Sequence, residues 1–399
     1  MPLKIEHCPE PALSPNKDIP WADTMVCNPG FIKDPKSDRL HMLFRACGPW
    51  PEKTPAGGKY PPYIWVLGYA HSDDLGKTWH PDYSRPAINA PLHTTPETLL
   101  VKNIYGDQVP DYANAYIEDP RFITIGTKVY VAVCTRMFPV GPYWLEGENY
   151  GVELYRPEWA RTDDNPFGAG VRSCGNVLYE VDMEKLAARD YEHAFTVVTH
   201  LTNPEFGEDR DVFPFPEKFT ICDKDQYLLV HRPNETQWYQ EAGAAPVQPS
   251  IFLSAAEDFR DFPTARAKQH FLFGPRFPWE KNKVGGSFTP IRISESEWLL
   301  SYHGTAPGIG YTQSFAILRE RANDFPEVAH RCPERLLYAS EPWEQPKLFP
   351  TPCLFTTAGI VIDGTLIMGY GAADQYVGTA TVKLADLTDH VRKFDVEGK

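Results

Sequence analysis

Two adjacent carboxylates, Glu118 and Asp119, stand in the stretch Tyr-Ile-Glu-Asp-Pro-Arg at residues 116–121. Pro120 lacks a backbone N–H and biases the residue before it towards an extended conformation, so we expect both acids at the mouth of a strand. A carboxylate fixed at the rim of a sheet is suited to general acid catalysis. The same residues also fit a solvated Asp-Pro turn tied to Arg121, and this stretch alone leaves both interpretations open.

The elements that position these acids are predicted to be strands. Residues 122–133 are mainly apolar and break at Gly126-Thr127, which is typical of a β-hairpin. Comparable strand-rich units recur five times along the chain, and only Asp182 to Tyr191 looks helical. We therefore predict an all-β fold, a five-bladed β-propeller with long loop insertions, as one catalytic domain over residues 1–399.

One octet supports the propeller interpretation. Residues Ser72 to Trp79 fit the form Ser-x-Asp-x-Gly-x-Thr-Trp, an Asp-box turn that joins the outer strands of propeller blades. The insertions at 139–172 and 233–249 are too long for hairpin turns. Long loops on a rigid scaffold select substrates or contact other subunits, and both roles stay open here.

Composition excludes several classes of protein. The formal charge of −14 argues against a nucleic-acid partner or an anionic membrane surface. The N-terminus has no apolar signal segment, and no apolar run is long enough to span a membrane, so we expect a cytoplasmic protein. The eight cysteines include no CxxC pair and the 12 histidines are dispersed, so neither a metal site nor a disulfide framework is indicated.

Six polar residues interrupt apolar strands at a similar place in each unit. Any one of them fits a structural residue whose hydrogen bonds are satisfied locally. Six that converge on one pocket would satisfy one another and a polyhydroxylated ligand instead. The six residues are Asn28, Arg45, Asp119, Arg232, His303 and Asp374.

Five short motifs, in matching order over most of the chain, resemble those of glycoside hydrolase family 130, the mannoside phosphorylases and related β-mannosidases on five-bladed propellers. The Ile-Glu-Asp-Pro-Arg motif at 117–121 is the most specific. The others are Asn28-Pro29-Gly30 with Leu43-Phe44-Arg45, Phe215-Pro216-Glu217-Lys218 with His231-Arg232-Pro233, Trp298 to Gly304, and Gly371-Ala372-Ala373-Asp374.

The resemblance implies an inverting enzyme with Asp119 as the general acid, which protonates the glycosidic oxygen, in phosphorylases by relay through a sugar hydroxyl. A catalytic carboxylic acid needs a raised pKa, which Glu118 and Asp374 in a closed pocket would supply. Arg121 opposes that shift and also fits a brace for the turn. The substrate-binding residues implied are Asn28, Arg45, Asp74, Glu118, Arg121, Arg232 and Asp374.

The nucleophile separates two enzyme hypotheses. A phosphorylase needs a cradle for phosphate, and His303 and Tyr311 match two of the family's places. Arg210 falls where the family has lysine, and Arg172 is the candidate for a remaining arginine; Arg210 also fits a solvated salt bridge.

A hydrolase needs instead a carboxylate base that activates water. The candidates are Glu217 and Glu280, although Glu217 also fits an ion pair with Lys218 or Arg232.

We favour phosphorolysis to mannose 1-phosphate. The alternative is a hydrolase, and a third hypothesis is a non-catalytic carbohydrate-binding propeller. The expected partners are a small oligosaccharide and phosphate as co-substrate, with no cofactor. The linkage and the acceptor sugar are not determined by the sequence. A homo-oligomer is compatible with the long insertions.

Overall fold

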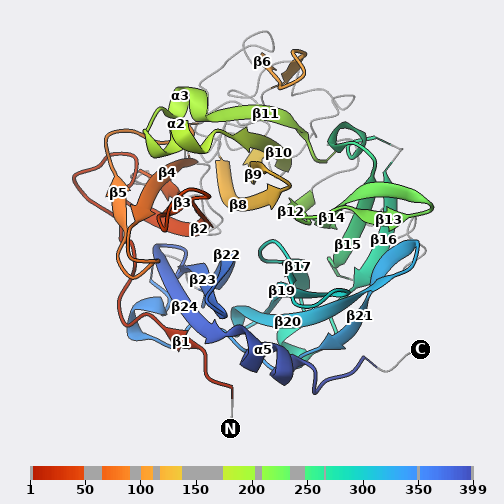
Figure 1. Cartoon of the computed structure of the whole chain (residues 1–399). Helices are drawn as coiled ribbons and strands as arrows, with labels where there is room; N and C mark the ends of the chain where they lie inside the picture. The colour runs from red at the N-terminus through yellow and green to blue at the C-terminus, as the bar shows by residue number, and fades with distance from the viewer. Residues whose placement is uncertain are drawn as a thin grey trace, which may run out of the picture.

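The computed structural model describes residues 3–48, 65–89, 100–110, 117–136, 174–202, 209–233, 248–264, 267–347 and 351–396. Five antiparallel sheets stand around a common centre, and the first strand of each lies nearest to it (Figure 1). The predicted five-bladed β-propeller is confirmed. The insertion 139–172 and most of 233–249 lie outside the described residues.

The first two blades hold the N-terminal third of the described chain. The first consists of β2 (Met25–Lys33), β3 (Leu40–Cys47), β4 (Trp65–Ser72) and β5 (His80–Asp82). The second consists of β8 (Ile117–Ile125), β9 (Lys128–Arg136), β10 (Cys174–Val181) and β11 (Phe195–His200). The hairpin of β6 (Leu100–Lys102) and β7 (Gln108–Pro110) forms a separate sheet beside β11.

The third and fourth blades each carry a short extra strand. The third consists of β12 (Asp209–Pro214), β14 (Lys224–Pro233), β15 (Ile251–Ala256) and β16 (Lys268–Phe273), with β13 (Phe219–Ile221) paired to β14. The fourth consists of β17 (Lys283–Gly286), β19 (Glu297–Ala306), β20 (Gly310–Arg321) and β21 (Asp324–Arg331), with β18 (Ile291–Arg292) paired to β19.

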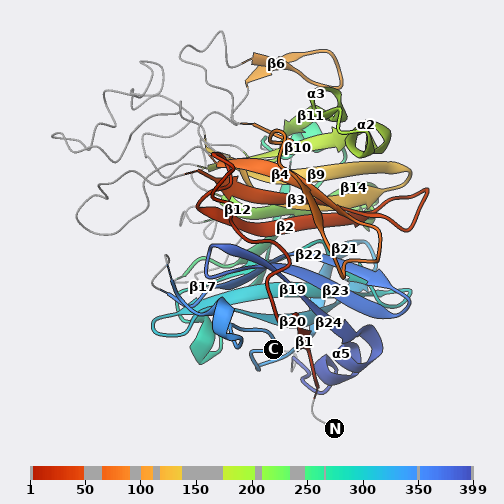
Figure 2. The ribbon, with the colours of Figure 1, turned by 90° about the vertical axis from the view of Figure 1, so that its left-hand side faces the viewer.

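The fifth blade closes the ring. It consists of β22 (Leu354–Ile362), β23 (Thr365–Ala372), β24 (Tyr376–Lys383) and the N-terminal strand β1 (Glu6–His7), which pairs with β24 (Figure 2). The outer strand of the last blade therefore comes from the opposite end of the chain. The spacing of the predicted strands did not indicate this closure, because the pairing of β1 with β24 joins residues more than 370 positions apart.

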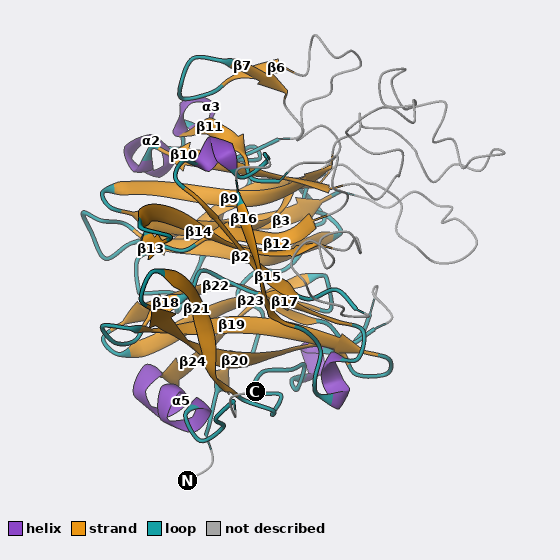
Figure 3. Ribbon diagram, turned by 90° about the vertical axis from the view of Figure 1, so that its right-hand side faces the viewer, coloured by secondary structure: helices purple, strands orange, loops and turns teal. Residues whose placement is uncertain are grey.

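Helices are few and lie at the edges of the blades (Figure 3). The predicted helical stretch contains α2 (Met183–Ala187), which Asp182 caps through the N–H groups of Glu184 and Lys185, and α3 (Tyr191–Ala194) follows. The helix α5 (Leu384–Val391) was not expected. Short 3₁₀ turns occur at Phe259–Asp261, Pro278–Glu280 and Pro342–Glu344. None of the described helices is long and apolar enough to cross a membrane.

The cores lie mainly between neighbouring blades, where aromatic side chains pack edge to face. Phe215 of the third blade, for example, contacts Phe219 and Trp298 with ring centroids 5.1 and 5.5 Å apart. Such contacts fix the angle between blades. They hold the five innermost strands, β2, β8, β12, β17 and β22, in a rigid ring.

Candidate active site

The same irregularity occurs in the innermost strands of the first three blades. Each strand shifts register at a β-bulge, and each bulge holds one residue in the left-handed region: Asn28 at φ 47°, Asp119 at φ 54° and Asp211 at φ 56°. Among non-glycine residues, Asn and Asp adopt this conformation most readily. A bulge redirects a side chain out of the regular alternation, and bulges are frequent beside active sites. Three blades thus present a polar side chain at equivalent places.

The first two of these side chains meet. The amide nitrogen Nδ2 of Asn28 donates to Oδ1 of Asp119 over 2.7 Å, while Asn28 Oδ1 is buried and has no hydrogen-bond partner in the described part of the chain. Burial raises the pKa of Asp119, and the charge of Glu118 adds to the rise, whereas Arg45 and Arg121 oppose it. The net effect is that the pKa of Asp119 is raised. A carboxylic acid needs a raised pKa if it is to carry and deliver a proton near neutral pH.

Arg45 organises the carboxylates around Asp119. Its Nη1 donates to Glu118 Oε2 over 2.7 Å and lies 3.8 Å from Asp119 Oδ1, and its Nη2 contacts Asp374. The guanidinium also stacks 4.4 Å from the centre of the Trp65 ring. One buried cation therefore holds three acids, two from β8 and one from the turn after β23, in one place. These polar groups suit the paired hydroxyls of a sugar ring.

A second, cationic group lies against the first and is joined to it by two side chains. Glu118 accepts from Arg45 on one oxygen and from Arg210 Nη1, 3.0 Å away, on the other. Arg121 donates to the carbonyl oxygen of Asp119 and lies 3.4 Å from the carboxylate of Asp211. The two groups form one continuous polar network at the centre of the ring.

Asp211 anchors this cationic group. Arg232 Nε donates to its Oδ2 over 2.6 Å, and His303 Nε2 lies 3.6 Å from the same oxygen. Burial by itself would raise the pKa of Asp211, but the charges of Arg232 and Arg121 outweigh it and hold that pKa well below its usual range. Gly285 makes room, because a Cβ there would lie 2.1 Å from Asp211 Oδ2.

The far side of the cationic group carries a lysine and two ring residues. Lys283 Nζ donates to the hydroxyl of Tyr311 over 2.7 Å, and the His303 and Tyr311 rings lie 5.7 Å apart. Burial lowers the pKa of His303 to about 3, so its imidazole is neutral at pH 7. Burial also raises the pKa of Tyr311, so its hydroxyl stays protonated. The set offers charge from arginine and lysine and neutral donors from histidine and tyrosine.

The structure brings together most of the residues that the sequence singled out. Near one another at the centre lie Asn28, Arg45, Glu118, Asp119, Arg121, Arg210, Arg232, His303, Tyr311 and Asp374. Within this network Arg121 serves as a brace, since its Nε also donates to the backbone oxygen of Ser287 over 2.7 Å. Arg172 lies outside the described residues.

The structure places Asp74, which was expected to bind sugar, in the Asp-box turn and apart from the network around Asp119. Its carboxylate accepts from Ser72, Lys77 and Thr78 within the Asp-box turn. In the register of β3 with β4, Ser72 pairs with Leu40, five residues from Arg45. At roughly 3.3 Å per residue, that places the turn about 16 Å from Arg45 along the blade. Asp74 therefore stabilises a turn at the other end of the sheet.

The carboxylates of both candidate bases are also bound to arginines outside the network around Asp119. The carboxylate of Glu217 is half exposed and forms a bidentate pair with Arg292, not with Lys218 or Arg232. The carboxylate of Glu280 is fully buried, where both of its oxygens accept from Arg331 and one also accepts from the N–H groups of Arg276 and Phe277. Each glutamate is committed to holding a loop.

Two residues of the site were missed by sequence reasoning. Asp211 was treated as an acid that would disturb an anion site, although Arg-Asp at 210–211 occupies the bulge position of Glu-Asp at 118–119. An alignment of the innermost strands at their bulges would have shown that Asp211 corresponds to Asp119. Lys283 begins the shortest innermost strand, in a Lys-Val-Gly-Gly run without a strong strand pattern, and no signal in the sequence marks it.

The arrangement has close counterparts among known proteins. A model of glycoside hydrolase family 130, described as β-1,4-mannooligosaccharide phosphorylase, matches residues 178–393. A 1,2-β-oligomannan phosphorylase of Thermoanaerobacter sp. (strain X514) is 23% identical over 380 residues, which are 95% of this chain and 96% of that protein.

Solved structures share the whole fold. The β-1,2-mannobiose phosphorylase from Listeria innocua, in complex with β-1,2-mannobiose, superimposes with a TM-score of 0.64 at 17% identity, covering 98% of this chain and 100% of that chain. A structure described as a family 130 glycoside hydrolase that targets β-1,2-mannosidic linkages in Candida mannan gives 0.61 at 14% identity, covering 96% and 95%.

Fold and matches together define a carbohydrate-active enzyme built on a five-bladed propeller. The family model covers more than half of the chain. The protein belongs to glycoside hydrolase family 130.

Proposed function

We propose that the protein is an inverting β-mannoside phosphorylase with Asp119 as its general acid. The observation that carries the proposal is the cationic group beside Asp119: Arg210, Arg232 and Lys283 supply charge, and His303 and Tyr311 supply neutral donors. Guanidinium groups bind phosphate in a bidentate manner, and lysine adds a point charge. Such a group suits inorganic phosphate better than a water molecule.

In the proposed reaction, a phosphate oxygen attacks C1 of the mannosyl unit on the face opposite the glycosidic oxygen. The bond between C1 and that oxygen breaks, and the proton of Asp119 passes to the departing oxygen, directly or through a sugar hydroxyl. Asn28, Arg45 and Asp374 hold the mannosyl hydroxyls. The products are mannose 1-phosphate and an oligosaccharide shorter by one mannose.

A hydrolase would need a carboxylate base. Both glutamates considered for that role are bound to structural arginines, Glu217 to Arg292 and Glu280 to Arg331. Asp211 is close to the site, but its lowered pKa makes it a weak base. These observations favour phosphate as the nucleophile, although the family also includes hydrolases.

For the linkage we propose β-1,2. The relative that matches nearly the whole chain is named for 1,2-β-oligomannan, and the Listeria innocua structure holds β-1,2-mannobiose. The family model is described by β-1,4-linked substrates, but it represents the family as a whole and matches only residues 178–393. We give the full-length relative more weight.

The test is to incubate β-1,2- and β-1,4-mannobiose with the enzyme, with and without inorganic phosphate, and to measure mannose 1-phosphate and free mannose. We expect phosphate-dependent release of mannose 1-phosphate from the β-1,2 isomer. General acid catalysis contributes about 10²–10⁴-fold, so Asp119→Asn should lose activity by that factor.

Asp74→Asn is the matched control, because Asp74 lies at the far end of its blade and should leave kcat/KM unchanged. Equal release of free mannose without phosphate would overturn the phosphorylase. Full activity in Asp119→Asn would overturn the role of the acid.

A further inference from the structure

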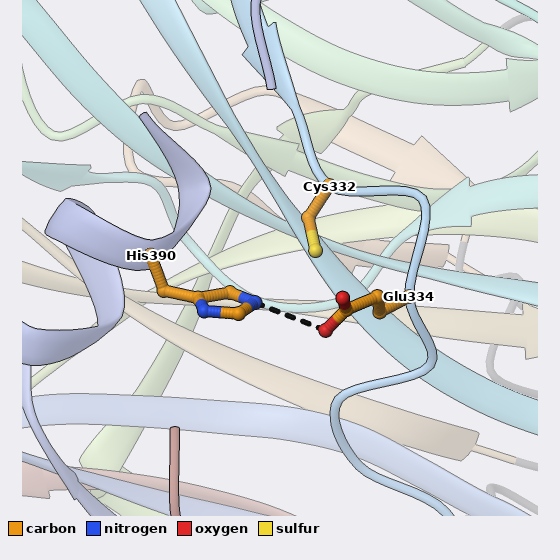
Figure 4. Close-up of side chains that lie close together, drawn as sticks. All are labelled: Cys332, Glu334 and His390. Carbon is orange, nitrogen blue, oxygen red and sulfur yellow. Dashed lines mark hydrogen bonds and ion pairs between the residues drawn. The ribbon is translucent and has the colours of Figure 1, made fainter. Parts of the chain in front are cut away.

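Three potential metal ligands meet at the outer side of the fourth blade, away from the candidate active site. Cys332 and Glu334 belong to the segment that follows β21, and His390 lies in α5 (Figure 4). One ligand atom of each lies within 4.8 Å of the others. No spacing along the chain indicates this cluster, because His390 is 56 residues from Glu334 and the histidines are dispersed.

The three ligand atoms lie within 4.8 Å of one another, so only a small adjustment is needed to form a tetrahedral metal site. Zinc binds sulfur at about 2.3 Å and nitrogen or carboxylate oxygen at about 2.0–2.2 Å, which places the ligands roughly 3.3–3.7 Å apart. His390 Nε2 and Glu334 Oε2 are already 3.0 Å apart. The Glu334 side chain is 54% exposed, so it can adjust to a metal ion without disturbing the core.

The neighbours of Cys332 and His390 restrict where the two side chains can lie. Cys332 is fully buried, and the hydroxyl of Ser314 donates to its backbone carbonyl oxygen over 3.2 Å, which helps to fix the segment that carries the thiol. The ring of His390 packs edge to face against Phe394 at 5.5 Å, which limits its rotation.

We propose that Cys332, Glu334 and His390 bind one divalent transition-metal ion, with zinc the preferred ion and water as its fourth ligand. A mixed sulfur, nitrogen and oxygen set suits zinc or cobalt(II) and is unsuited to magnesium or calcium. The proposal is independent of the reaction that the enzyme catalyses.

The ion would fasten the C-terminal segment to the fourth blade. That segment already pairs with β21, since Arg331 N donates to Phe394 O and Val396 N donates to Ala329 O, each over 3.0 Å. α5 itself continues from β24 of the fifth blade. A metal bridge from Cys332 to His390 therefore joins the last blade to its neighbour, and its effect is on stability.

The experiment uses the full chain after treatment with a chelator and dialysis. Cobalt(II) is titrated while the thiolate-to-cobalt charge-transfer absorption is followed, and bound zinc is then measured by elemental analysis. We expect one ion per chain. The absorption should be absent in Cys332→Ser, and the cobalt affinity should fall at least about tenfold in His390→Gln, since even partners outside the first shell are worth about 10–100-fold.

Cys222→Ser is the control, because Cys222 is an exposed thiol elsewhere. It should bind cobalt as the wild type does. Zinc should raise the melting temperature of the wild type and of Cys222→Ser but not of His390→Gln. No charge-transfer band in the folded wild type, or a band unchanged in both Cys332→Ser and His390→Gln, would overturn the proposal and leave a plain Glu334–His390 ion pair.

Discussion

Asp211 offers the sharpest test of how the cationic group is built. The change Asp211→Asn keeps the shape of the side chain but removes the negative charge that Arg232 approaches to 2.6 Å and Arg121 to 3.4 Å. Removing one partner of a buried ion pair costs about 3–5 kcal/mol. Since the amide oxygen can still accept from Arg232, we take the lower end, about 3 kcal/mol.

This cost converts to a modest change in melting temperature. Unfolding entropy is about 2.1 cal/mol/K per residue, or about 0.84 kcal/mol/K for the 399 residues of this chain. A loss of about 3 kcal/mol should therefore lower Tm by about 3–4 °C. The variant should stay folded and can be assayed.

Phosphate should then stabilise the variant more than it stabilises the wild type. With one negative charge removed beside Arg232 and Arg121, the group attracts an anion more strongly, so the Kd for phosphate falls and the stabilisation RT ln(1 + [L]/Kd) rises. At the same time a neutral amide oxygen holds Arg232 less firmly than a carboxylate does, so kcat should fall. The assay is Tm by calorimetry across a phosphate titration, with chloride at matched ionic strength.

Asp82→Asn is the matched control, since Asp82 is a buried carboxylate that accepts from Tyr191 away from the site. It should lose stability without any gain in the response to phosphate. If phosphate raises the Tm of Asp211→Asn no more than that of the wild type, the idea that Asp211 balances an anion-binding group is refuted.

Three further predictions follow from the same contacts. Lys283→Met should raise the KM for phosphate about 10–100-fold in initial-rate assays, because a hydrogen bond to a charged group contributes about 1.5–3 kcal/mol. Glu118→Gln should lower the pKa of Asp119 by removing a neighbouring negative charge, so the alkaline limb of the kcat/KM profile should move to lower pH. Glu280→Gln should lower Tm, whereas Glu217→Gln should change stability by less than about 1 kcal/mol, and neither should abolish cleavage of the β-mannoside.

Each of these three predictions has a control variant or a result that would contradict it. Lys281→Met changes an exposed lysine two positions before Lys283 and should leave the KM for phosphate unaltered. An alkaline limb that stays in place in Glu118→Gln would mean that Asp119 is not the group that titrates there. Loss of cleavage in Glu217→Gln, with the fold intact, would bring back a glutamate base and the hydrolase.

Local patterns were enough to predict the blades and to single out Glu118 and Asp119 as site candidates. Alternating apolar runs and their turns define strands over a few residues, and Ile-Glu-Asp-Pro-Arg at 117–121 was recognisable because it resembles the most specific motif of the family. These residues do lie in β8, but Asp119 is not extended as Pro120 led us to expect, because the β-bulge holds it in the left-handed region at φ 54°. The sequence thus determined the fold class, the number of blades and the family.

Only the tertiary structure decided which polar residues share a site. Asp74 and Glu217 are acids in recognisable motifs, yet their carboxylates are held by a turn and by Arg292, respectively. Lys283 and Asp211 come from strands of two different blades and meet around His303 and Tyr311. The physical reason is that spacing along the chain determines which way a strand's side chains point, whereas packing between blades determines which side chains they meet.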